Sequence, residues 1–312
     1  MDEVVRREKD AASYMIDGCE PELDVSPESG VKRKRRIPST LRAFLKNRGA
    51  TVGALMLSAW LLAAIFAPIV APHDPLDVIA GSRQPPGPGH LLGTDLLGRD
   101  VLSRIIFGAR LSLRLGLVSV VIGLTAGIVL GLPPGYYGGA VDTVFMRVMD
   151  AMLAFPGLLL ALVIIASLGP GLMNVMLAVG ISSVPSYARL VRGSTLSIRE
   201  VAYIEAARLI GCTSLRIMFR HILPNLIGPV IVLATLQIGS AILVGSSLSY
   251  LGMGAQPPTP EWGLMTAEGR SYLASAWWIS TFAGVAIFTA VISINLMGDG
   301  LRSALDPRAR VR

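Results

Sequence analysis

The sequence predicts an all-α membrane protein with about six transmembrane helices, and its composition and long uncharged stretches support that prediction. Of its 312 residues, 52% are hydrophobic and 16% are charged, and the mean hydropathy is +0.60. Soluble domains usually carry more charge and less apolar surface. Six stretches of about 20 residues are nearly free of charge, as helices that cross a hydrocarbon layer require. They cover 52–72, 114–133, 148–169, 172–188, 226–248 and 278–297.

The spans divide the chain into five regions. Residues 1–40 are acidic and then basic, lack an apolar period, and are expected to form a disordered cytoplasmic extension. Residues 41–75 hold the first span with its flanks, and 76–113 an external loop with an interfacial helix. A five-helix core follows over 114–300, interrupted by a cytoplasmic loop at about 189–225, and 301–312 form a cytoplasmic tail.

The distribution of basic residues predicts the orientation. Six spans put both termini on one side, and with both termini in the cytoplasm, 22 of the 28 Lys and Arg fall in cytoplasmic segments. Five arginines between 83 and 114 are exceptions, and we expect them along the interfacial helix with their side chains reaching lipid head groups. The basic run 32–36 precedes a span without interleaved aromatic residues, which favours anionic lipid over nucleic acid as its partner. A multi-pass membrane protein with both termini in the cytoplasm follows.

The sequence contains no pattern that indicates catalysis or a bound cofactor. Cys19 and Cys212 both lie in expected cytoplasmic segments, so no disulfide is implied. His73, His90 and His221 lack the spacing of metal ligands. None of the four lysines stands in a Gly-Lys-Ser or Gly-Lys-Thr context, which a phosphate-binding loop requires. We therefore expect no cofactor or metal on this chain and no ATP hydrolysis by it.

The segment between the fourth and fifth spans has a distinctive pattern. Good helix formers surround Ala206 and Ala207, whose small side chains would let a partner surface approach closely. Gly211 is suited to end that helix in a left-handed conformation. Residues suited to cap a second short helix and to open a third follow, namely Thr213 or Ser214 and then Pro224. The pattern predicts a compact elbow of short helices.

This segment resembles the EAA loop of ABC importer permeases, which couples the membrane subunit to an ATPase. The resemblance implies a coupling role for Glu205, Ala206, Ala207, Arg208, Gly211, Leu215, Arg216, His221, Leu223 and Pro224. The general pattern has an apolar residue where His221 stands, and His-x-Leu-Pro-Asn is similar to the peptide and nickel branch. An ordinary linker with a chance Glu-Ala-Ala is the alternative.

Further motifs resemble the C-type subunits of dipeptide and oligopeptide permeases. They begin at Leu92-Gly-Thr-Asp-Leu-Leu-Gly-Arg-Asp and Gly135-Tyr-Tyr-Gly-Gly, continue through 248–263, and end over 295–308. The external residues Asp95, Arg99, Asp100, Glu261 and Trp262 are candidate partner contacts. For the first three we rank structural anchoring higher, and for Trp262, with Tyr250, an interfacial anchor is an equal alternative. Arg147 and Asp150 are spaced to meet on one helical face, and Pro156 is expected to kink the third span.

The resemblance implies the type I ABC importer permease fold, a location in the plasma (inner) membrane and a role as the C-type transmembrane subunit. The implied partners are a second permease subunit in a heterodimer, two ABC ATPase subunits that bind ATP and Mg²⁺, an extracytoplasmic substrate-binding protein and membrane lipid. Dipeptides or oligopeptides are the expected substrates. A nickel complex or another small solute is the alternative.

Two other classes of protein predict different sequence features. A secondary transporter or channel that needs no ATP predicts charged residues within the membrane and no docking loop, and the spans lack Asp, Glu, Lys and Arg at their centres. A membrane-embedded enzyme predicts a nucleophile, a metal cluster or paired carboxylates. The polar residues within the spans suit either a pore lining or hydrogen bonds between helices; they include Asn174, Gln237, Ser240, Ser246, Ser247 and Asn295.

Overall fold

The computed structural model describes residue 44 and residues 47–305. The expectations for residues 1–40 and for most of the tail lie outside this part. Within it the chain is helical, and the only extended pairings are isolated bridges in the loop that precedes residue 101. The prediction of an all-α protein is confirmed for the described residues.

Four long apolar helices match four of the six predicted spans. They are α3 (Arg48–Ile65), α5 (Val101–Tyr137), the continuous helical segment Ser214–Tyr250, which ends in α11 (Leu223–Tyr250), and α13 (Trp277–Leu305). The fourth predicted span lies inside α8 (Leu172–Arg199), which has 28 residues but also carries serines and arginines that lower its hydropathy. By length and composition, the described residues therefore contain four candidate spans, or five if a bent pair of helices is counted.

The bent pair replaces the third predicted span. Helices α6 (Gly139–Leu153) and α7 (Gly157–Leu168) meet at an angle of 94° around Phe155 and Pro156. Proline has no N–H group and disfavours helical backbone in the residue before it. The backbone of Pro156 is extended at ψ 133°, so the helix breaks there. The expected kink is confirmed and is large enough to divide the segment.

Small residues bring α5 and α8 into close contact. Gly123, Gly127 and Gly131 recur every four residues on one face of α5. A Cβ atom built at Gly127 would lie 2.3 Å from the Cβ atom of Tyr187, and one at Gly131 would lie 2.5 Å from the carbonyl oxygen of Ala188. No larger side chain has room at these positions, and such spacing is common where membrane helices pack backbone to backbone.

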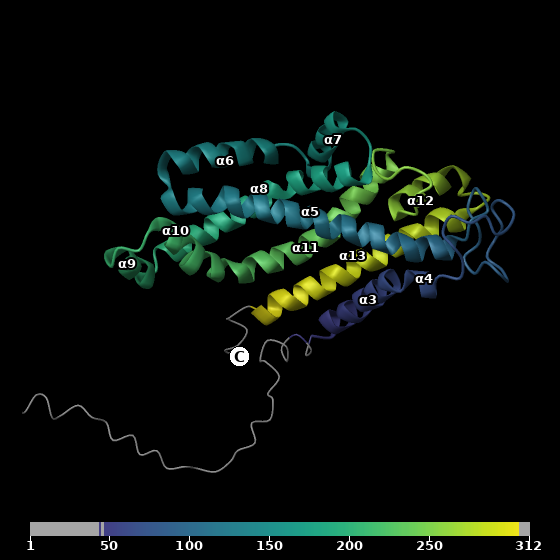
Figure 1. Cartoon of the computed structure of the whole chain (residues 1–312), viewed down its shortest axis with the longest axis horizontal. Helices are drawn as coiled ribbons and strands as arrows, with labels where there is room; N and C mark the ends of the chain where they lie inside the picture. Colours follow the sequence, from purple (N-terminus) through teal and green to yellow (C-terminus); the bar gives the residue numbers. More distant parts are fainter. Residues whose placement is uncertain (1–43, 45–46, 306–312) are drawn as a thin grey trace, which may run out of the picture. The chain divides into compact units, whose positions relative to one another are not determined.

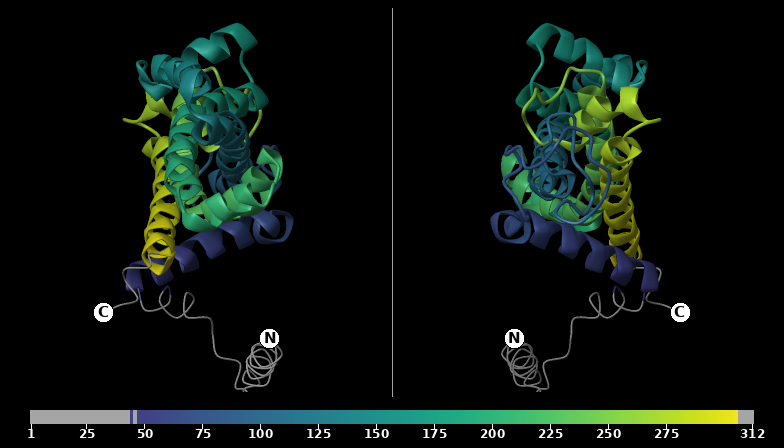
Figure 2. Two further views of the ribbon diagram at one scale, coloured as in Figure 1. Left: turned by 90° about the vertical axis from the view of Figure 1, so that its left-hand side faces the viewer. Right: turned by 90° about the vertical axis from the view of Figure 1, so that its right-hand side faces the viewer.

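Helix α3 is in contact with α13 and crosses it at an angle, and the two run in opposite directions along the long axis of Figure 1 (Figures 1 and 2). Near the start of α3, a Cβ atom built at Gly53 would lie 2.7 Å from the carbonyl oxygen of Ser293. About two turns after Gly53, the indole N–H of Trp60 donates to the hydroxyl of Thr289 at 3.3 Å. The first span is thereby attached to the last.

Helix α5 corrects the expectation of a separate interfacial helix. It begins at Val101, where the Asp100 carboxylate accepts from the backbone N–H of Ser103 at 2.8 Å, and continues without a break to Tyr137. Two of its arginines bind protein groups. Arg104 is fully buried, and Arg110 donates to the carbonyl oxygens of the last residues of α3. The expected contact with lipid head groups is wrong for Arg104, whereas Arg110 is exposed.

Ion pairs tie α6 to α8. Arg192 donates to the Asp142 carboxylate at 2.6 Å, and Arg189 donates to Asp150 at 2.7 Å. Asp150 thus pairs across helices, and the expected pairing with Arg147 on its own helix is wrong. The neighbouring helix brings a guanidinium within reach of Asp150.

The short helices lie toward the two ends of the long ones. One end holds α9 (Ala202–Leu209), α10 (Ser214–Arg216) and the π-helical turn η1 (Ile217–Ile222). The loop over 71–100, the short α4 (Ala67–Val70), α12 (Trp262–Gly269) and the 3-10 turn η2 (Arg270–Tyr272) lie toward the other end (Figure 1). The two groups of candidate residues are therefore at opposite ends of the molecule.

Candidate functional site

Helix α9 ends in the left-handed turn that the sequence predicts. Gly211 has φ +82°, its N–H bonds to the carbonyl oxygen of Arg208, and the N–H of Cys212 bonds to the carbonyl oxygen of Ala207, each at 3.0 Å. This pair of hydrogen bonds is the Schellman arrangement, which satisfies carbonyl groups at a helix end. A Cβ atom at Gly211 would have no neighbour within 4 Å. Glycine is therefore required here by the backbone conformation and not by a contact within this chain.

The second half of the segment is one continuous helix and does not contain the expected turn before Pro224. The Thr213 hydroxyl accepts from the N–H of Arg216 and caps α10, as one of the two sequence alternatives proposed. From there the backbone passes through η1 into α11, with the N–H of Leu223 bonded five residues back to Met218. Proline lacks a donor and its ring clashes with the carbonyl four residues earlier. The wider π turn before Pro224 accommodates this.

The inner face of α9 packs on its own chain. Ile204 is fully buried and Ala207 is almost so, and both belong to an apolar cluster with Ile217, Met218 and Ile222 of η1. The small side chain of Ala207 therefore permits a close approach within this chain. The expectation that the Ala206–Ala207 face is the partner surface is wrong for Ala207, while Ala206 is exposed.

Exposed apolar side chains form the outer surface of the same segment. We call Leu209, Ile210, Leu215 and Phe219 the elbow patch; their exposed fractions are 84%, 80%, 64% and 60%. Of these, only Leu215 was predicted from the sequence to take part in coupling. The signal was present for Leu209 and Ile210, because exposed apolar residues at the tip of an arginine-rich segment indicate a contact with another protein or with lipid.

The other predicted coupling residues surround the elbow patch. The Arg208 guanidinium lies 5.1 Å from the centre of the Tyr136 ring, and the His221 ring lies 6.5 Å from that of Tyr203. His221 is half-buried, and its carbonyl oxygen accepts from the Asn225 amide at 2.6 Å. Of the remaining coupling candidates, Leu223 is half-buried, whereas Glu205, Arg216 and Pro224 are exposed.

At the opposite end, four charged side chains form a buried cluster. The Asp95 carboxylate accepts from Arg99 Nε at 2.6 Å and lies 3.4 Å from Arg104 Nε. Glu268 on α12 lies 3.3 Å from the Arg104 guanidinium. Burial raises the pKa of the Glu268 carboxyl, and the charges of Arg104 and Arg99 act in the opposite direction. The cluster anchors the loop over 71–100 to α5 and α12.

Glu261 and Trp262 are also fully buried, at the start of α12. Glu261 accepts from the N–H groups of Gly263 and Leu264 and caps the helix, although burial raises the pKa of its carboxyl. The Trp262 indole donates to the carbonyl oxygen of Ile105 at 2.9 Å and packs edge-on against Trp60. The alternative of Trp262 as an interfacial lipid anchor is wrong.

The side chains of these five candidates are therefore buried beneath the surface. Asp95, Arg99 and Asp100 are at most 3% exposed, which agrees with structural anchoring. A direct contact between any of the five side chains and a partner is not possible in this conformation. Among residue 44 and residues 47–305, no group of three His, Cys, Asp or Glu side chains is placed to hold a metal ion.

The polar residues within the spans separate into two sets. Gln237 and Ser240 line a cavity between α5, α8 and α11, and Ser246 and Ser247 line a shallower one beside α12. The remaining two are partly buried and contact neighbouring helices. Asn174 donates to carbonyl oxygens at the end of α7, and the Asn295 amide is packed against Gly239 of α11.

Comparison with protein families gives two matches that together cover most of the described chain. The family described as binding-protein-dependent transport system inner membrane component matches residues 123–311. The N-terminal transmembrane domain of oligopeptide transport permease C matches residues 39–86.

Characterised relatives are similar over nearly their whole length. The di/tripeptide transport system permease protein DppC of Pseudomonas aeruginosa is 48% identical over 88% of this chain and 94% of its own. The glutathione transport system permease protein GsiD of Pectobacterium atrosepticum is 44% identical over 86% and 90%. A structure of the MetNI methionine ABC transporter, facing inward, has a TM-score of 0.53 at 18% identity, over 65% of this chain and 96% of that one. That likeness shows the fold alone.

Proposed function

The chain belongs to the family of inner membrane components of binding-protein-dependent transport systems, and from that premise we propose that it is the C-type permease subunit of an ATP-driven importer of dipeptides or oligopeptides. It forms half of the translocation pathway, and a second permease subunit forms the other half. The chain itself is a non-catalytic membrane subunit.

The elbow patch is the observation that carries this proposal. Its four apolar side chains project from the tip of a segment rich in arginine, where water would otherwise contact them. Exposed apolar groups in such a place mark a protein interface. We assign the patch to an ABC ATPase, two copies of which bind ATP and Mg²⁺ and supply the energy that this chain lacks.

The orientation follows from the charges. Helices α8 and α9, with the connection to α11, carry Arg189, Arg192, Arg199, Arg208, Arg216 and Arg220. The positive-inside rule favours the cytoplasm for that end and for both termini. The anchored loop over 71–100 and α12 then face the extracytoplasmic side, where a substrate-binding protein delivers the solute.

The substrate class rests on the relatives. The relatives are named for transport of dipeptides, tripeptides and glutathione, all of which contain amide bonds. Uptake of a labelled dipeptide by the source cell, by a deletion strain and by the strain complemented with this chain tests the proposal. Loss on deletion and recovery on complementation are expected. Competition by unlabelled dipeptide, but not by a nickel complex, supports peptides. Dipeptide uptake that is unchanged on deletion, together with loss of nickel uptake, assigns the alternative substrate.

The ATPase contact is tested on the same complex. Replacing Leu209 and Ile210 by Ser should remove the ATPase from the purified transporter, because both side chains are at least 80% exposed within this chain and are free to contact a partner. Leu91→Ser is the matched control, since Leu91 is 67% exposed in the external loop. ATPase that co-purifies equally with the double variant and with the control contradicts the assignment.

A further inference from the structure

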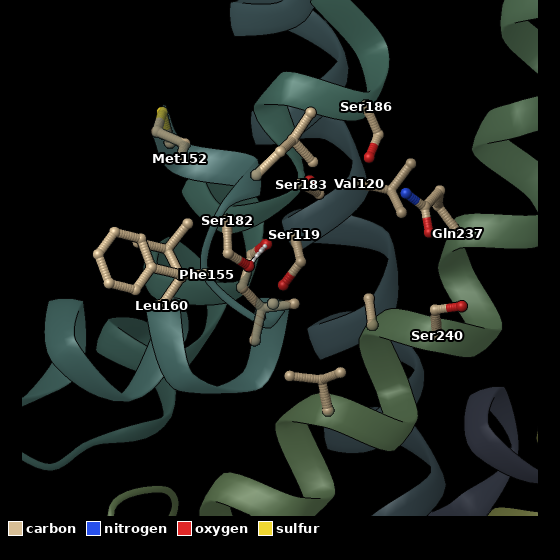
Figure 3. Close-up of a pocket in the computed structure, with 15 residues that line it drawn as sticks. Ser119, Val120, Met152, Phe155, Leu160, Ser182, Ser183, Ser186, Gln237 and Ser240 are labelled. Atoms are coloured by element: carbon tan, nitrogen blue, oxygen red, sulfur yellow. Dashed lines mark hydrogen bonds between the residues drawn. The ribbon is translucent and has the colours of Figure 1, made fainter. Parts of the chain in front are cut away.

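A cavity of about 250 Å³ with a partly polar lining lies among α5, α8, α11 and the bend between α6 and α7 (Figure 3). Ser119, Ser182 and Ser183 gather on one side, while Gln237 and Ser240 come from α11 on the other. A hollow in a membrane protein that combines apolar walls with a few polar groups is a place where a solute can bind.

The serine hydroxyls are oriented by their own helices. Ser182 Oγ donates to the carbonyl oxygen of Val179 at 2.9 Å, and Ser183 Oγ donates to that of Gly180 at 2.7 Å. Ser119 Oγ donates across helices to the carbonyl oxygen of Met176 at 3.1 Å. A hydroxyl has one donor and two acceptor positions. With the donor engaged, the oxygen is left to accept, so this side of the cavity favours a ligand that carries N–H groups.

The remaining lining contributes shape without charge. The bend between α6 and α7 contributes Met152, Phe155 and Leu160, and no residue that lines the cavity is Asp, Glu, Lys, Arg or His. A charged group would select solutes by the sign of their charge, and the flexible Met side chain adapts to varied shapes. The cavity is therefore able to hold the backbone of a peptide and to accept many different peptide side chains.

We propose that this cavity is a contact site for the backbone N–H groups of a peptide in transit, with Ser182 as a principal acceptor. The assignment rests on the proposed peptide substrate and adds how the permease recognises it. Because the contact is made to the backbone, it is indifferent to whether the peptide side chain is acidic, basic or neutral.

The test compares a dipeptide with its amide N-methylated analogue, which has the same charge but lacks the amide N–H. Uptake of both by the reconstituted complex with its binding protein gives a preference ratio. The variants are Ser182→Ala, Ser182→Thr and the control Ser167→Ala. Ser167 also bonds back to its own helix, to Val163 at 3.4 Å, but is exposed on α7 and does not line the cavity.

Ser182→Ala should lower the wild-type preference for the unmethylated dipeptide about fivefold, the order expected for one hydrogen bond. Ser182→Thr, which keeps the hydroxyl, and Ser167→Ala should retain the preference. The binding protein is identical in every arm, so a change in the ratio belongs to the permease. In Ser182→Ala, uptake of acidic and basic dipeptides should change by the same factor.

Two outcomes overturn the proposal, and they are distinguishable. If the wild-type complex imports the dipeptide and Ser182→Ala leaves the preference ratio unchanged at normal membrane abundance, the contact site is wrong and the peptide function stands. If the wild-type complex imports no peptide, the proposed function is wrong, and so is the assignment of a peptide to this cavity.

Discussion

Gly211 is the position at which a single methyl group tests the coupling mechanism. In the described structure its φ is +82° and a Cβ atom has open space around it. Gly211→Ala therefore introduces strain in the backbone and no clash within this chain. An L-residue in that region is disfavoured by about 1 kcal/mol, which shifts the population of the correct turn about fivefold.

Gly211→Asn separates backbone strain from side-chain bulk. Asparagine is larger than alanine but visits the left-handed region more readily. If the turn geometry controls coupling, stimulated ATP hydrolysis and uptake should fall in the order wild type, Asn, Ala. Gly211→Asp has nearly the shape of Asn and adds a charge at the face that we assign to the ATPase, so it should couple least.

The assay is ATP hydrolysis and peptide uptake in proteoliposomes, with and without loaded binding protein. Gly193→Ala is the matched control, because Gly193 lies on α8 near the same end, also has open space, and has helical backbone. Alanine should be tolerated there or should stabilise the helix slightly. Wild-type uptake and stimulated hydrolysis in Gly211→Asp would refute the assignment of this segment to coupling.

Other predictions concern packing, topology and the N-terminal segment. Gly127→Val should prevent normal accumulation in the membrane, because its side chain enters the space of Tyr187; wild-type abundance and melting would contradict the close packing. Arg104→Met should lower the free energy of unfolding by about 3 kcal/mol by leaving buried carboxylates without this partner, and an unchanged melting temperature would contradict that. A cysteine at Glu200 in a cysteine-free chain should resist an impermeant reagent in intact cells, and labelling would reverse the topology. Deleting residues 1–30 should leave uptake intact; loss of uptake at normal abundance would assign a role to that segment.

Features that depend on one residue and its neighbours in the chain were predictable. The turn at Gly211 follows from the conformational freedom of glycine, and the break at Pro156 follows from the missing N–H and from steric conflict. The long apolar stretches also predict helices of sufficient length to span a bilayer. These are local properties, and four of the six spans match long apolar helices in the structure.

Contacts between helices were harder to predict from the sequence. Asp150 was expected to bind Arg147 because helical spacing is visible in a sequence, whereas its partner Arg189 comes from α8. Glu261 and Trp262 were candidates for partner contact because the aromatic and proline content of their loop suits a rigid external platform, but packing against α5, α11 and α13 buries both. Burial in a loop depends on what folds over it.

By itself, the sequence determined an apolar helical protein, the places where its helices break, and a family resemblance centred on Gly211. Only the tertiary structure decided which face of each helix is covered. It turned Ala207 inward and left Ile210 exposed, and it brought Ser119 and Ser182 to one cavity from different helices. The physical reason is that helix rotation and packing are set by many distant contacts together, which no local pattern of residues specifies.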